Sequence, residues 1–125
     1  MNLTKGEALF ITKLLNKKPE LRHGTQLIFI TNKSECGPCE EQVQAFYSED
    51  FENHPKTFVV SPNQQYGNQW KDTLQFTYRE LGSYGLIRVT GAVLILDHGE
   101  CTLLESIDLA HLNHLKDQIL KELQN

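Results

Sequence analysis

Cys36 and Cys39 are the residues of this sequence whose type and spacing best suit them to chemistry. Gly37 and Pro38 alone separate them, so both thiols fall within one turn if a helix begins there. A dithiol of this spacing can close a short disulfide, or it can supply two thiolates to a metal ion. The chain has only 3 cysteines in total, which is too few and the wrong parity for a disulfide framework.

The segments on either side of the motif favour redox chemistry. Residues 27–30 are an unbroken apolar run, typical of a central strand that is buried on both faces. The apolar spacing after Cys39 predicts a helix, and Cys36 would then lie near unpaired backbone N–H groups, where the helix dipole stabilises a thiolate. We therefore predict that Cys36 attacks a substrate disulfide and that Cys39 resolves the mixed disulfide. The substrate leaves reduced, and the protein is left oxidised.

Composition excludes several classes of protein. The chain has 125 residues, a formal charge of −4, 39% apolar and 22% charged residues, so a single globular domain over residues 1–125 is expected. The net negative charge argues against nucleic acid as a partner. No stretch approaches the roughly 18 apolar residues of a membrane span, and Lys5, Glu7 and Lys13 interrupt any signal-peptide core. We expect a cytoplasmic protein with no membrane partner.

The rest of the chain alternates helical and strand patterns. A capping box of Thr4 and Glu7 predicts a first helix that ends before Pro19, and Asp108 can cap a last amphipathic helix. Between them the apolar patterns predict these elements: a strand at 58–60, a helix at 72–81 with Leu74, Tyr78 and Leu81 as its apolar face, and a hairpin of strands 92–96 and 101–107 around a turn at 97–100. This order predicts a mixed sheet with helices on both faces, its first two strands parallel.

The motif and the order of elements resemble the thioredoxin superfamily over nearly the whole chain. Cys-Gly-Pro-Cys after an apolar strand is similar to the thioredoxin motif, and the hairpin with Gly99 and Glu100 in its turn resembles the end of a thioredoxin. A weaker resemblance is to the cytosolic 14-kilodalton thioredoxin-related proteins, and these residues carry it: Trp70-Lys71-Asp72, Phe76, Arg79 and Val89-Thr90.

The resemblance implies both a fold and an activity. The fold is a thioredoxin-like three-layer α/β/α sandwich with a mixed central sheet. The activity is that of a thiol-disulfide oxidoreductase without a cofactor, which reduces protein or small-molecule disulfides and receives electrons from a reductase.

Three positions depart from the thioredoxin pattern. Glu35 stands where thioredoxins have Trp, and its charge is expected to raise the pKa of the Cys36 thiol. Ile30 stands where thioredoxins have a buried Asp. No proline is available for the usual cis-proline opposite the motif: alignment on the hairpin puts Gly91 at that position, and alignment on Val89-Thr90 puts Val93 there. The expected neighbours of the two cysteines are Glu35, Gly37, Pro38, Thr90 and Gly91.

Several other functions are compatible with a Cys-x-x-Cys pair. One is an interaction module of thioredoxin fold whose redox activity is vestigial. Another is a dimer in which two chains share a zinc ion or an iron–sulfur cluster through four thiolates, two from each chain, because Gly91 or Val93 would leave the thiolates more open than a proline does. The acids near Cys36 would favour such a cation.

Two zinc-binding arrangements within one chain are less favourable. A set of Cys36, Cys39, His98 and Cys101 requires the hairpin turn near the motif, but a strand over 92–96 places the turn roughly 15 Å away. Cys101 is expected to be a buried core residue instead. A zinc deaminase needs a His-x-Glu motif on an earlier helix, whereas His98-Gly99-Glu100 follows the cysteines and lies in a turn. No metal site is therefore assigned within a single chain.

Overall fold

A computed structural model describes residues 2–31, 37–60, 73–86 and 91–124 of the chain. Glu35, Cys36 and Thr90 lie outside these ranges. The described residues form a five-stranded sheet with the strand order β3-β2-β1-β4-β5. Its strands are β1 (Thr25–Ile30), β2 (Lys56–Val60), β3 (Thr73–Gln75), β4 (Ala92–Asp97) and β5 (Glu100–Ser106). β1, β2 and β3 run parallel, and β4 and β5 are antiparallel to their neighbours.

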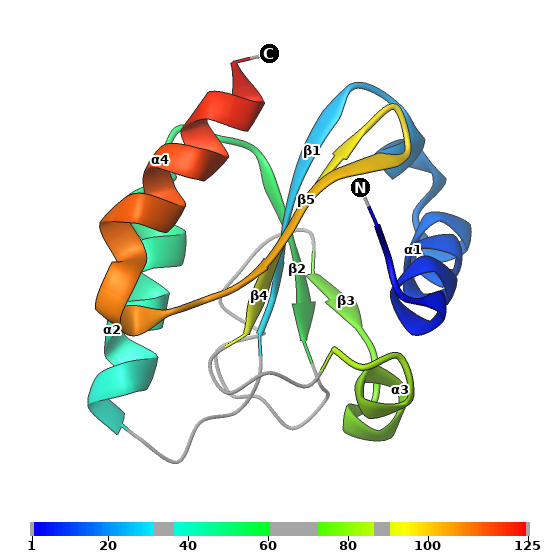
Figure 1. The fold of residues 1–125 in the computed structure, drawn as a ribbon, viewed down its shortest axis with the longest axis horizontal. Coiled ribbons are helices and arrows are strands. Elements are labelled where there is room, and N and C mark those ends of the chain that lie inside the picture. The colour runs from blue at the N-terminus through cyan, green and yellow to red at the C-terminus, as the bar shows by residue number, and fades with distance from the viewer. Residues whose placement is uncertain (1, 32–36, 61–72, 87–90, 125) are drawn as a thin grey trace.

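Helices cover both faces of this sheet. Figure 1 shows α1 (Lys5–Lys17) and α3 (Tyr78–Ser83) on one side and α2 (Gly37–Ser48) and α4 (Leu112–Leu123) on the other. The short 3₁₀ helix η1 (Pro19–Arg22) joins α1 to β1, and the short 3₁₀ helix η3 (Leu109–His111) joins β5 to α4. The structure therefore has the predicted three layers, and its β1-α2-β2 unit followed by β4, β5 and α4 makes a thioredoxin-like fold.

The central strand β1 is buried on both faces, as the apolar run predicts. Ile28 and Ile30 belong to the apolar cluster that α1 and α3 cover, whereas Leu27 and Phe29 belong to the cluster that α2 and α4 cover. These four side chains are at most 2% exposed. The strand therefore lacks the alternation of polar and apolar residues that is typical of a strand with one solvent-exposed face.

The predicted ends of α1 and the predicted hairpin are confirmed. Thr4 and Glu7 form the capping box of α1, and the helix stops at Lys17, before Pro19 begins η1. β4 and β5 are joined by a tight turn in which His98 and Gly99 have φ values of 51° and 84°, the left-handed conformation of a two-residue hairpin turn. Asp108 also acts as a cap, although it caps η3, and α4 begins after that 3₁₀ turn.

The predicted helix over residues 72–81 is confirmed only from Tyr78 onward, where α3 begins and Leu81 is buried. Thr73–Gln75 is the edge strand β3, in which Leu74 pairs with Val59 of β2, and α3 begins only at Tyr78. Tyr78, expected on the apolar face, is 58% exposed. The physical reason is the open hydrogen-bonding edge of β2, which a three-residue strand can satisfy even where the apolar spacing also suits a helix.

Protonation of Glu80 is expected to weaken the start of α3. Glu80 accepts a hydrogen bond from the Thr77 N–H (3.0 Å) and lies 3.2 Å from Lys13, and these contacts hold the pKa of its carboxyl below the ordinary 4.5. Because the folded-state pKa is the lower one, this stabilisation is present above the unfolded pKa and is lost as pH falls through the folded value. Glu80→Ala should therefore lower the urea midpoint slightly at neutral pH.

Urea unfolding at pH 7 and pH 3 measures this effect. The difference in urea midpoint between the wild type and Glu80→Ala should shrink at pH 3, because a larger fraction of the Glu80 carboxyl is then protonated. The exposed Glu105 on the edge strand β5 supplies a control, Glu105→Ala, whose small effect should not change with pH. A Glu80→Ala effect of the same size at both pH values would contradict the role of its charge.

Candidate functional site

The Cys-x-x-Cys segment lies where the chain passes from β1 to α2. β1 ends at Ile30 and α2 begins at Gly37, so Pro38 and Cys39 belong to the first turn of the helix. Cys36 and Glu35 directly precede this turn and fall outside the described residues. The predicted sequence of strand, motif and helix is thus present at the carboxyl end of the central strand.

One face of α2 is packed against the sheet. Val43 and Tyr47 follow Cys39 at intervals of four residues, and both are buried in the cluster between α2 and the sheet. The Phe29 ring of β1 lies 4.3 Å from the ring of Tyr47 and 6.1 Å from that of Phe46, centroid to centroid. These contacts fix the position of the helix that carries Cys39.

Gly91 lies at the same edge of the sheet as the start of α2. It precedes Ala92, which pairs with Ile30, the last residue of β1. Its φ is 117°, and a Cβ atom placed on it would lie 2.4 Å from the Ile30 carbonyl oxygen and 2.8 Å from the Tyr47 hydroxyl. Val93, in contrast, pairs with Phe29 inside the sheet and is fully buried. Gly91 therefore lies against the carboxyl end of β1, whereas Val93 lies within the sheet, and the position of Gly91 relative to the two thiols stays a prediction.

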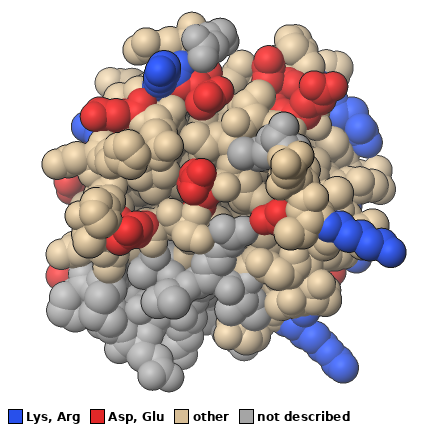
Figure 2. All heavy atoms as spheres, viewed as in Figure 1, with Lys and Arg blue, Asp and Glu red and all other residues tan. Residues whose placement is uncertain are grey.

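Acidic side chains are exposed along and after α2. Glu41, Glu49, Asp50 and Glu52 are exposed, and the last turn of α2 has no basic residue. The Lys116 ammonium lies 3.9 Å from the Asp50 carboxylate, at the long end of the range for an ion pair. Figure 2 shows acidic side chains spread over the face in view, whereas several Lys and Arg side chains project from the margin on the α1 side. This distribution favours a negative potential around α2.

His98 and Cys101 lie far from the start of α2. The hairpin turn that holds His98 adjoins Asp97, which pairs with Thr25 at the amino end of β1, whereas α2 begins beyond the carboxyl end of that strand. Cys101 is half-buried against the core cluster on the α1 side, and this burial raises the pKa of its thiol. The expectation of a fully buried Cys101 is thus met only in part.

Within the described ranges, no three His, Cys, Asp or Glu side chains are placed so that they could hold a metal ion.

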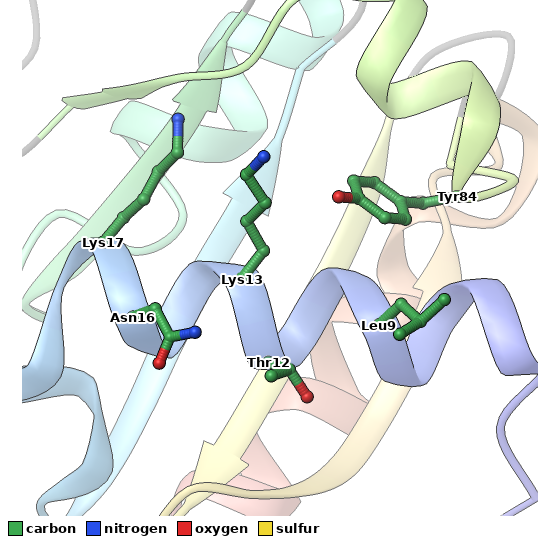
Figure 3. A pocket seen from close by; sticks show the side chains of 6 residues that line it. All are labelled: Leu9, Thr12, Lys13, Asn16, Lys17 and Tyr84. Carbon is green, nitrogen blue, oxygen red and sulfur yellow. The ribbon is translucent and has the colours of Figure 1, made fainter.

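A shallow pocket of about 420 Å³ opens on the opposite layer, along α1. Figure 3 shows Lys13 and Lys17 extending from α1, with Tyr84 across from Leu9. Lys13 pairs with Glu80, and the Lys17 ammonium donates to the Gln75 carbonyl and lies over the Phe76 ring. These ammonium groups hold α1 to β3 and α3, and the pocket lies across the sheet from α2.

The sequence gives no sign of the contact that Tyr47 makes, nor of the close approach of the backbone at Gly91, although Gly91 itself is a predicted site residue. Tyr47 reads as one more apolar residue of an amphipathic helix, although its hydroxyl reaches the Ile30 carbonyl oxygen at 3.5 Å. The close approach at Gly91 likewise has no local signal beyond the residue type. Thr77 and Glu80, by contrast, form a signal that can be detected in the sequence, because Thr-x-x-Glu is the capping-box pattern that starts α3.

Comparison with known proteins gives distant similarities in structure. The chain resembles the solution structure of a thiol:disulfide interchange protein from Bacteroides sp., with a TM-score of 0.48 and 9% identity over 80% of this chain and 76% of that one. It also resembles Mycobacterium tuberculosis AhpC, with a TM-score of 0.43 and 15% identity over 79% and 75% of the two chains. No protein-family model and no curated protein matches the sequence. The strand order and the helix placement, rather than these similarities, define the thioredoxin-like fold.

Proposed function

We propose that the protein is a thiol-disulfide oxidoreductase that reduces protein or small-molecule disulfides through Cys36 and Cys39. The observation that carries the proposal is the place of Cys39 in the first turn of α2, directly beyond the carboxyl end of the buried central strand. At such a helix start the backbone N–H groups and the helix dipole favour a thiolate. No described helix is long and apolar enough to cross a membrane, and a cytoplasmic location is part of the proposal.

The proposed reaction is a pair of thiol-disulfide exchanges. The Cys36 thiolate attacks one sulfur of the substrate disulfide, so a bond forms between Cys36 and that sulfur while the other sulfur leaves as a thiolate. The Cys39 thiolate then attacks the Cys36 sulfur, closes the Cys36–Cys39 disulfide and releases the second substrate thiolate. Two electrons pass from the protein to the substrate, and a reductase must return them.

A redox titration tests this function. The protein is equilibrated with mixtures of reduced and oxidised dithiothreitol, free thiols are alkylated, and the mass is read. We expect Cys36 and Cys39 to lose their reactivity together, with the same midpoint in Cys101→Ser. If no intramolecular disulfide forms at any potential, the oxidoreductase function is refuted in favour of an interaction module. A dimer whose zinc or iron disappears in Cys36→Ser would instead favour the metal-bridged arrangement.

The acidic surface around α2 leads to a prediction about substrate charge. Oxidised glutathione, which is anionic, should react more slowly than the cationic disulfide cystamine. Added salt should speed the first reaction and slow the second by about 2- to 10-fold, because the interactions are screened over roughly 8–10 Å. Stopped-flow rates between low and high ionic strength measure the effect.

Matched variants locate the charges that are responsible. Glu41→Gln on α2 should weaken the salt dependence, whereas Glu100→Gln, at the far end of the β4-β5 hairpin, should leave it unchanged. Rates that do not respond to ionic strength for either substrate would contradict a negative potential at the site.

A further inference from the structure

One side of α1 lines a groove that the proposed reaction does not use. The opposite side of this helix is buried in the core, through Phe10, Ile11, Leu14 and Leu15. The shallow pocket of about 420 Å³ is lined by Tyr84, at the end of α3, and by residues of α1 that follow one another at intervals of one and three: Leu9, Thr12, Lys13, Asn16 and Lys17. Because a helix rises about 1.5 Å per residue, the stripe from position 9 to position 17 is about 12 Å long. We call this surface the α1 groove.

One end of the α1 groove is apolar. Leu9 is 51% exposed, and Figure 3 shows the Tyr84 ring across from it. Tyr84 is held in place by the core, since its ring lies 5.9 Å from that of the buried Phe10, centroid to centroid. An exposed leucine beside a fixed aromatic ring is an apolar surface whose removal from water is favourable. This end of the groove therefore suits an apolar side chain of a partner.

The other end of the α1 groove is basic. Lys13 and Lys17 are exposed and lie one helical turn apart. The Lys13 ammonium lies 3.2 Å from the Glu80 carboxylate, and the Lys17 ammonium donates a hydrogen bond of 3.1 Å to the Gln75 carbonyl. An ammonium group has three N–H donors, so it can share such a contact with a bound carboxylate. The two contacts also orient both ammonium groups before any ligand arrives.

The segment that carries the α1 groove differs in charge from the rest of the chain. The chain has a formal charge of −4, whereas α1 and η1 together are basic. Their charged residues are Lys5, Lys13, Lys17, Lys18 and Arg22 against Glu7 and Glu20. The Glu7 carboxylate accepts a hydrogen bond from the Thr4 N–H at 2.8 Å, so it is engaged in the start of the helix. In Figure 2, Lys and Arg side chains project from the margin on the α1 side. Charge complementarity at this surface therefore favours an anionic partner.

We propose that the α1 groove binds an acidic segment of a partner protein. An apolar side chain of that segment lies between Leu9 and Tyr84, and its carboxylates lie at Lys13 and Lys17. The inference is independent of the proposed function, because the groove and α2 are on opposite faces of the sheet (Figure 1).

The middle of the α1 groove favours a peptide over a lipid surface. The Thr12 hydroxyl can accept a hydrogen bond and the Asn16 amide can donate one, and these are the two roles that a peptide backbone requires. An interfacial helix, in contrast, inserts a continuous apolar face into the membrane. The apolar end of the α1 groove offers one leucine and one tyrosine ring, and the stripe then becomes polar.

A nuclear magnetic resonance titration tests the proposal. Two synthetic peptides, capped at both ends, are added to the ¹⁵N-labelled protein: Leu-Glu-Glu-Glu-Glu and Leu-Lys-Lys-Lys-Lys. We expect the acidic peptide to shift the backbone amide signals along α1 and at Tyr84 in a saturable way. The basic peptide should leave these signals in place, because it meets the ammonium groups with like charges.

Substitutions in the α1 groove should change the affinity in both directions. Lys17→Gln and Leu9→Ser should each weaken binding of the acidic peptide by about 3- to 10-fold. Glu80→Gln removes the carboxylate that competes for Lys13, so it should strengthen binding by about 2- to 3-fold. Lys121→Gln, on α4 in the other helical layer, is the matched control and should not change the affinity. Urea unfolding of each variant confirms that the fold is retained.

Several results would overturn the proposal. They are an acidic peptide that shifts no signal along α1, a basic peptide that binds equally well, and a Lys17→Gln affinity equal to that of Lys121→Gln. Vesicles of phosphatidylserine provide the last comparison: a protein that sediments with them but does not bind the acidic peptide has a lipid site instead. Cys36→Ser should bind the peptide as the wild type does, so failure of the oxidoreductase function would leave this inference standing.

Discussion

Cys36→Ser should reduce disulfide-reducing activity by about 10³-fold or more, because a serine hydroxyl cannot replace the thiolate nucleophile at neutral pH. Cys39→Ser should behave differently. Its Cys36 can still attack, but nothing resolves the product, so a mixed disulfide between Cys36 and the substrate should accumulate. Turnover of oxidised glutathione coupled to a chemical reductant measures the first effect, and intact mass shows the trapped glutathionyl adduct of the second.

Cys101→Ser is the control for this pair of variants. Cys101 lies on β5, half-buried on the α1 side of the sheet, and the proposed reaction does not use it. The disulfide-reducing activity of Cys101→Ser should stay within about twofold of that of the wild type. Turnover that survives in Cys36→Ser, or an adduct that forms on Cys101 instead of Cys36, would contradict the assigned nucleophile.

Gly91→Ala should strongly destabilise the fold, by about 2–4 kcal/mol. The new methyl group would stand 2.4 Å from a backbone oxygen of the central strand, and the backbone φ of 117° is itself unfavourable for alanine. Both costs fall where β1 and β4 meet, so neither strand can move without disturbing their pairing. Urea unfolding, followed by circular dichroism, gives the free energy of unfolding for each variant.

Gly24→Ala separates the two costs. Gly24 also has a positive φ, of 64°, but a Cβ atom there meets nothing within 4 Å, so only the conformational cost of about 1 kcal/mol remains. The difference between the two variants isolates the steric conflict with the Ile30 carbonyl. Equal losses of stability would show that the close approach at Gly91 is unimportant.

The sequence by itself determined the elements whose signals are local. A run of apolar residues without alternation identifies β1, because a strand buried on both faces has no polar side to show. Thr4 and Glu7 mark the start of α1, since their side chains satisfy N–H groups within the same helical turn. The two-residue turn at His98 and Gly99 marks the hairpin for a similar reason, as its geometry depends on those residues alone.

The same local signals predicted the chemistry of the candidate site, but not its surroundings. Two thiols between a strand and a helix indicate dithiol redox chemistry through their spacing and the dipole of the helix. The helix start at Gly37 agrees with that context. The roles of Cys36 and Cys39 remain predictions for the titration and the variants described above.

Only the tertiary structure decided the features that depend on partners distant in sequence. Residues 73–75 form a strand because the edge of β2 offers them hydrogen bonds, and periodicity within the segment cannot reveal an open edge 13 or more residues away. Gly91 and Tyr47 meet at the Ile30 carbonyl through three segments of the chain. Their contact is a matter of ångströms between backbone and side chain, and such distances are set by packing rather than by local preference.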